Sequence, residues 1–153
     1  MSPGARLKRK SVSGGVEKKL TSVKNGILKV GVLRGQGEHP GGNAGQTIAE
    51  VAFWNEFGTA TIPARSFMRS TLKEEKSVYK KVFRETYRQM LNQKIVINQA
   101  IGILGMKVSS DIQHKITQIS TPPNADYTKD KKGSSNPLID TGALRRSITW
   151  EKV

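Results

Sequence analysis

Side chains that could support catalysis or bind a metal are sparse in this sequence. The two histidines, His39 and His114, are far apart in the chain, and there is no cysteine thiol to join them as a metal ligand. No serine or threonine stands in a recognisable nucleophile–base arrangement, and no pair of carboxylates falls where a pocket is expected. The sequence therefore predicts no catalytic residues, no metal site and no cofactor, which favours a binding or structural protein over an enzyme.

Glycines are concentrated between residues 35 and 46, after an expected strand and before an expected helix. Such a loop suggests phosphate binding, but the spacing after Gly35-Gln36-Gly37 does not fit a dinucleotide-binding turn. Gly45-Gln46-Thr47 also lacks the lysine of a P-loop. We therefore expect an exposed, flexible loop rather than a nucleotide site.

A second candidate for chemistry lies near the C-terminus. The run Leu138-Ile139-Asp140-Thr141-Gly142-Ala143 is similar to the catalytic loop of retroviral-type aspartic proteases. Those enzymes need a β-rich stretch with a flap and a second aspartate across a dimer. Here long helical segments precede the motif, and 11 residues follow Gly142. We interpret Asp140 or Thr141 as the cap of a short helix instead.

The stretch that organises the chain joins a short apolar run, 48–54, to the longest periodic segment, which begins near Phe67. It reads Asn55-Glu56-Phe57-Gly58-Thr59-Ala60-Thr61-Ile62-Pro63-Ala64-Arg65-Ser66-Phe67. Gly58 can adopt the positive φ that ends a helix, and Pro63 makes the residue before it extended. Composition alone is also compatible with an ordinary joint between two helices.

Arg65 falls where the second helix of this joint begins. A cation is poorly placed there against the helix macrodipole, so a carboxylate is expected to hold it. Glu56 is the nearest candidate. We therefore predict an ion pair between Arg65 and Glu56, with Phe57, Phe67 and Leu144 in the core.

The string Trp54-Asn55-Glu56-Phe57-Gly58, followed by Ile62-Pro63-Ala64-Arg65-x-Phe67, resembles the central motif of tail-completion (neck) proteins of long-tailed double-stranded DNA bacteriophages. Those proteins usually have a proline where this chain has Ser66, a difference that loosens the helix start. A second part of the resemblance is Pro137-Leu138-Ile139-Asp140-Thr141-Gly142-x-Leu144-x-x-Ser147-Ile148. The match covers roughly residues 27–153.

This resemblance implies a virion structural protein of the neck or tail, which completes the tail and joins it to the DNA-filled head. It implies a homo-oligomeric ring around the DNA ejection channel, in contact with head-side connector or adaptor proteins and with tail-terminator or tail-tube proteins. Localisation would be the virion, and the host cytoplasm during assembly. The motif residues implied in assembly are Asn55, Glu56, Phe57, Gly58, Pro63, Arg65, Phe67, Asp140, Thr141, Gly142 and Leu144.

Length and charge limit the other interpretations. The 153 residues suit one domain, and 26 basic against 12 acidic residues give a net charge of +14. This charge indicates an anionic partner or a self-repelling surface. Aromatic residues make up only 6% of the chain, so non-specific contact with phosphates is expected but base stacking is not. No apolar run approaches the roughly 18 residues that cross a membrane.

Two basic segments are candidate contacts with DNA or a partner. Residues 1–15 form a basic arm with almost no apolar residues, which we expect to be flexible, and residues 16–153 form the single domain. A polar loop is expected over 121–137. The basic residues concerned are Arg6, Lys8, Arg9, Lys10, Lys129, Lys131 and Lys132. A solvated tail is an equally valid interpretation of the arm.

Apolar periodicity predicts the remaining elements and an α+β fold. The expected elements are helix 16–24, strand 27–33, helix 47–57 capped by Thr47 and Glu50, helices 67–91 and 97–119, a short helix to Ser147 and strand 148–153. A small antiparallel sheet, with one further strand beyond these two allowed for, would pack against a long helical hairpin. Gly102 and Gly105 would admit the backbone of the neighbouring helix. A small basic nucleic-acid-binding protein acting alone is the alternative function.

Overall fold

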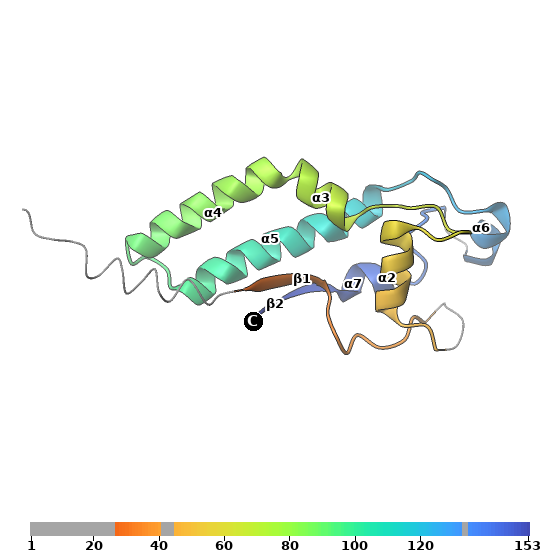
Figure 1. The fold of residues 1–153 in the computed structure, drawn as a ribbon, viewed down its shortest axis with the longest axis horizontal. Coiled ribbons are helices and arrows are strands. Elements are labelled where there is room, and N and C mark those ends of the chain that lie inside the picture. The colour runs from red at the N-terminus through yellow and green to blue at the C-terminus, as the bar shows by residue number, and fades with distance from the viewer. Residues whose placement is uncertain (1–26, 41–44, 133–134) are drawn as a thin grey trace, which may run out of the picture.

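The computed structural model describes residues 27–40, 45–132 and 135–153, so the predicted arm 1–15 and helix 16–24 lie outside the described residues. The chain is a mixed α+β protein, mostly helical, with a two-stranded antiparallel sheet, as predicted (Figure 1). Its elements are β1 (Leu28–Val32), α2 (Ile48–Phe57), α3 (Met68–Glu74), α4 (Lys76–Leu91), α5 (Ile97–Gln118), α6 (Asp126–Lys132), α7 (Ala143–Ser147) and β2 (Ile148–Lys152).

The sheet joins the two ends of the described chain. β1 and β2 pair antiparallel with Val30 opposite Trp150, which confirms the predicted pairing of the C-terminal strand. Leu28, Val30 and Val32 alternate along β1, the period of a half-buried strand. The further strand is absent from the part of the chain that the structure describes, where the sheet has two strands.

Helices α4 and α5 form the predicted hairpin, and α5 lies between α4 and the sheet (Figure 1). The single helix expected over 67–91 is, however, two helices. Glu75 breaks it, with φ −87° and ψ 5°, and α3 turns away from the axis of α4. Apolar spacing continues across this break, so periodicity could not reveal it.

The core lies at one end of this hairpin. Phe67, Ile112, Ile116 and Ile148 have the largest fully buried side chains, and Leu138, Leu144 and Ile48 pack with them. Helices α2 and α7, the start of α3, the C-terminal half of α5 and the sheet therefore meet in one cluster. The other end of the hairpin contributes no residue to the fully buried set.

α2 begins as predicted, because Thr47 and Glu50 form a capping box. The Glu50 backbone N–H donates to Thr47 Oγ1 at 3.2 Å, and the Thr47 N–H donates to Glu50 Oε2 at 2.9 Å. Ile48 and Ala52 are buried, and Val51 is half-buried. The Phe53 side chain, on the same helix, is exposed.

The two glycines in α5, Gly102 and Gly105, leave space for the side chain of Trp150 and not for the backbone of a neighbouring helix. A Cβ built on Gly105 would lie 2.5 Å from Trp150 Cδ2, and one on Gly102 would lie 3.4 Å from Trp150 Cη2. The indole of β2 therefore lies flat on α5 where these residues leave a gap. This corrects the expectation that α4 approaches there.

The segment 121–137 is not a structureless loop, because it contains α6. The carboxylate of Asp126, in the first turn of α6, interacts favourably with the helix dipole. Lys129 Nζ lies 2.8 Å from Asp126 Oδ1 and forms an ion pair with it. Helix α5 ends at Gln118, shortly before Pro122 and Pro123.

We predict that Gly105→Ala is less stable than Gly102→Ala by about 1–3 kcal/mol, the usual cost of overpacking. The gain of helix propensity, roughly 1 kcal/mol, is the same at both sites and cancels in the comparison. Urea unfolding followed by circular dichroism measures both variants. Equal stability of the two would contradict the close contact between Trp150 and Gly105.

Candidate functional site: the joint between α2 and α3

A tight turn connects α2 to α3. Gly58 ends α2 with φ 79°, and its N–H donates to Trp54 O at 2.8 Å. A Cβ at this position would lie 3.0 Å from the backbone nitrogen of Ala64, so both φ and space require glycine. The predicted role of Gly58 as a helix end is thus confirmed. Pro63 lies exposed in the turn that follows.

The carboxylate of Glu56 is the centre of this joint. The residue is only 3% exposed, and its side chain sits against the N-terminus of α3. Oε2 accepts from the backbone N–H groups of Phe67 and Met68, both at 2.8 Å. Oε1 accepts from the Arg69 N–H at 3.0 Å and from Ser66 Oγ at 2.7 Å. Glu56 therefore caps α3 from another helix, and α3 has no side-chain cap at its own N-cap position.

Electrostatics favour the charged form of this carboxylate. Burial alone raises the pKa of Glu56, but the hydrogen bonds from Met68, Arg69 and Ser66 outweigh it, so the pKa is lowered from its usual range. The N-terminal end of α3 adds a favourable dipole. The arrangement resembles an anion-binding helix terminus in which the anion is the protein's own side chain.

Arg69 is the cation that pairs with Glu56, which corrects the predicted pairing with Arg65. Arg69 Nε lies 3.0 Å from Glu56 Oε1, and its Nη2 donates to Glu56 O at 2.8 Å. The guanidinium also lies 4.4 Å above the ring of Phe57, within the range of a cation–π contact. Phe57 itself is 51% exposed, so its predicted place in the core is wrong.

Arg65 is buried at 4% exposure and binds the segment after α5 instead. Its Nε donates to Pro122 O at 2.7 Å, and its Nη2 donates to Pro123 O at 2.9 Å and to Asn124 Oδ1 at 3.2 Å. Its Nη1 donates to Asn55 Oδ1 at 3.3 Å. The planar fork of arginine suits this set of acceptors, which a lysine could not match. Arg65 therefore ties the joint to a segment 57–59 residues later in the chain.

The second predicted motif lies beside the first. α7 packs on α2, and Leu144 is buried in the same core cluster as Phe67. Asp140 does not cap α7, which is a correction. Gly142 occupies the N-cap with φ 76°, and Thr141 Oγ1 accepts from the Ala143 N–H at 3.3 Å.

The basic candidates of α6 are not part of this site. Lys129, Lys131 and Lys132 belong to α6, which Figure 1 places at the end of the molecule opposite the α4–α5 turn. Arg6, Lys8, Arg9 and Lys10 lie outside the described residues.

Sequence reasoning missed Arg69 and the carbonyls of 122–123. No clear signal for this was present in the sequence, because a helix predicted from residue 67 has Ser66 at its N-cap. Only the observed N-cap at Phe67 leaves the first amides of α3 without a local side-chain acceptor.

Comparison of the chain with models of protein families, with curated proteins and with solved structures found no match. Within residues 27–40, 45–132 and 135–153, no three His, Cys, Asp or Glu side chains gather as a metal site would require. The described helices include none that is long and apolar enough to cross a membrane.

We predict that Glu56→Gln lowers the free energy of unfolding by about 2–4 kcal/mol, because buried donors lose a charged acceptor and Arg69 loses its partner. Glu85→Gln, which removes an exposed carboxylate paired with Arg88, is the matched control and should change stability by less than about 0.5 kcal/mol. Urea unfolding of both variants at pH 7 measures the difference.

The same pair of proteins, wild type and Glu56→Gln, tests the pKa. The pKa of Glu56 is lower in the folded chain than in the unfolded chain, where it is about 4.3. Its contribution is therefore complete above that value and is lost as the pH falls through the depressed folded value. The stability gap between the two proteins should narrow in acid. A gap that stays constant from neutral pH into that acid range would refute the assignment.

Arg65→Lys should cost about 1–3 kcal/mol, since one ammonium cannot replace the fork that serves four acceptors. Amide hydrogen exchange should also become faster at Thr128 and Lys129, whose N–H groups donate to Ala125 O, because the segment that precedes them loses its anchor. Arg84→Lys is the control, as Arg84 is exposed on α4. Unchanged exchange at Thr128 and Lys129 would show that Arg65 does not hold this segment.

Proposed function

We propose that this protein is a non-enzymatic structural component of a bacteriophage virion, which completes the tail or neck and joins it to the DNA-filled head. The observation that supports this proposal is the convergence of the two motifs. The stretch around Glu56 and Arg65 and the stretch around Leu144 carry the resemblance to neck proteins, and they pack into one core through α2 and α7.

Each motif residue with a defined contact has a conformational task in this unit. Gly58 turns the chain, Glu56 caps α3, and Arg65 with Asn55 holds the segment 122–124. Residues that together stabilise one conformation are expected to occur together in proteins that share that fold.

The proposed assembly is a homo-oligomeric ring around the DNA ejection channel. Its neighbours would be head-side connector or adaptor proteins on one side and tail-terminator or tail-tube proteins on the other. Basic side chains facing the channel would attract packaged DNA without sequence preference and with a strong dependence on salt. Residues of the arm and of α6, including Lys129, are the candidates for that contact.

A small basic nucleic-acid-binding protein acting alone is the second candidate function. The net charge of +14 favours it. It would bind DNA as a free monomer, whereas a neck protein acts once assembled.

The test adds purified protein to an extract of infected cells that lacks it. We expect separate heads and tails to become joined particles, which electron microscopy counts. Reversing Lys129, Lys131 and Lys132 to glutamate should then reduce DNA retention in the joined particles. The control reverses Lys73, Lys81 and Lys94, which changes the net charge equally at other exposed positions. Tight DNA binding by a monomer that joins nothing would favour the second function.

A further inference from the structure

The outer edge of β1 is a second candidate site, and residues 29–33 share a groove with Glu56 and Phe57 of the joint. Ile27 and Val153 exchange both backbone hydrogen bonds, so alternate residues of β1 bond to β2 and the others point away from it. The outward-pointing backbone groups belong to Leu28, Val30 and Val32. Across the described ranges, no other strand pairs with this edge. A bare strand edge is a template for another strand.

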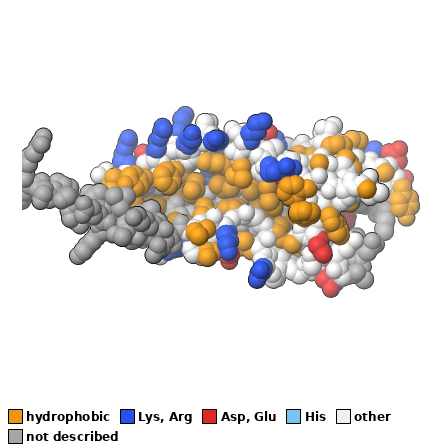
Figure 2. All heavy atoms as spheres, viewed as in Figure 1, with side chains coloured by type: hydrophobic (Ala, Val, Ile, Leu, Met, Phe, Trp, Pro, Cys, Tyr) orange, Lys and Arg blue, Asp and Glu red, His pale blue; other side chains and the backbone are white. Residues whose placement is uncertain are grey.

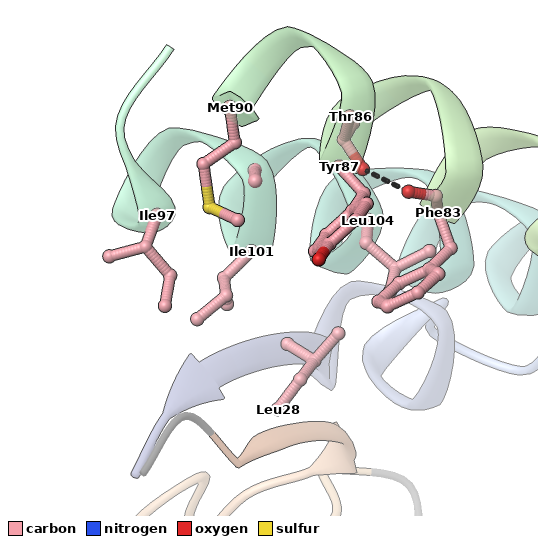
Figure 3. A pocket seen from close by; sticks show the side chains of 9 residues that line it. Leu28, Phe83, Thr86, Tyr87, Met90, Ile97, Ile101 and Leu104 are labelled. Atoms are coloured by element: carbon pink, nitrogen blue, oxygen red, sulfur yellow. Dashed lines mark hydrogen bonds between the residues drawn. The ribbon is translucent and has the colours of Figure 1, made fainter. Parts of the chain in front are cut away.

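An apolar surface adjoins that edge. Leu28 forms one wall of a hollow of about 130 Å³ whose other walls come from α4 and α5. Figure 3 shows Leu28 pointing from β1 toward Phe83 and Tyr87 of α4. The Phe83 ring stacks on Tyr87 with centroids 6.2 Å apart and is nevertheless 54% exposed. This face is therefore apolar and open.

The open face continues along the hairpin. A neighbouring hollow is lined by Leu72, Tyr79, Phe83 and Leu104, and Leu72 is 49% exposed. Figure 2 shows the apolar side chains as a band along the molecule, with basic side chains gathered above it. We call this the α4–β1 band, defined by Leu28, Leu72, Phe83, Tyr87, Met90 and Leu104. An apolar band of this kind on one face marks a binding surface.

The position of β1 indicates what would cover the band. Leu28, at the start of β1, supplies the wall that faces α4, whereas residues 29–33 line a groove with α2. The end of an added strand that lies beside Leu28 would therefore lie beneath α4. Side chains on one face of that strand would then contact Phe83 and Tyr87. One added strand would thus satisfy the free backbone groups and bury the band at the same time.

Charge decides the chemistry of the occupant. Lys76, Lys80 and Arg84 line the band, and none of the three forms an ion pair with any described residue. A second copy of the chain, with its own net charge of +14, would be repelled here. Acidic side chains would be attracted. We propose that an extended segment of another protein, with alternating apolar and acidic residues, binds as a third strand along β1. This inference does not depend on the neck proposal.

The test uses the full chain and a fluorescein-labelled peptide of about eight residues that alternates valine and glutamate. Fluorescence anisotropy should show saturable binding. The same peptide with N-methyl groups on alternate residues cannot donate its backbone hydrogen bonds on that side, and should bind about tenfold more weakly or worse. Equal affinity of the two peptides would overturn strand addition.

Two protein variants separate the local charges from the net charge. Reversing Lys76, Lys80 and Arg84 to glutamate should weaken binding by about tenfold or more, whereas the equal reversal of Lys73, Lys81 and Lys94 should change it by less than about threefold. Phe83→Ala, which truncates an exposed ring, should also weaken binding. Equal effects of the two reversals would overturn the proposed site. A dimer in sedimentation that the Phe83 change dissociates would instead identify a second copy as the occupant.

Discussion

The buried carboxylate of Glu56 is the constraint on which the rest of the fold depends. It sits at the last turn of α2 and accepts hydrogen bonds from the first backbone amides of α3, which have no acceptor of their own. Unpaired N–H groups at a helix N-terminus cost free energy, and so does a buried charge without a partner. Here the carboxylate and the N–H groups bind each other, so neither is left unpaired. The relative placement of α2 and α3, and through α3 the direction of the hairpin, follows from that contact.

Arg65 extends the same unit to the far end of α5. By binding the carbonyls of Pro122 and Pro123 it fixes the chain where it leaves the hairpin. The segment that follows then returns to place α7 against α2, with Leu144 and Phe67 in one core. The charged residues of the motif thus act at two separate contacts. These residues stabilise the conformation of the chain, and we propose a neck function for the protein that they build.

The core is unevenly distributed, and this has consequences for partners. Phe67, Ile112 and Ile116 close the end of the molecule near the joint, whereas Phe83 and Leu72 remain exposed along the hairpin. With two strands, the sheet covers α5 but leaves the sheet-facing side of α4 open. A protein that is well packed at one end and has an open apolar and basic face at the other is suited to binding a further segment.

The sequence by itself determined the fold class, the strands β1 and β2, the helices α2 and α5, the capping box of Thr47 and the helix end at Gly58, because each depends on neighbours within a few residues. Only the tertiary structure decided that Glu56 pairs with Arg69, that Arg65 binds the 122–124 segment, and that Trp150 fills the gap at Gly105. The break at Glu75 and the exposure of Phe53 and Phe57 were decided there as well. Local periodicity and capping leave a sequence signature. The choice of partner for a long charged or aromatic side chain does not, since it depends on which distant segments the fold brings within reach.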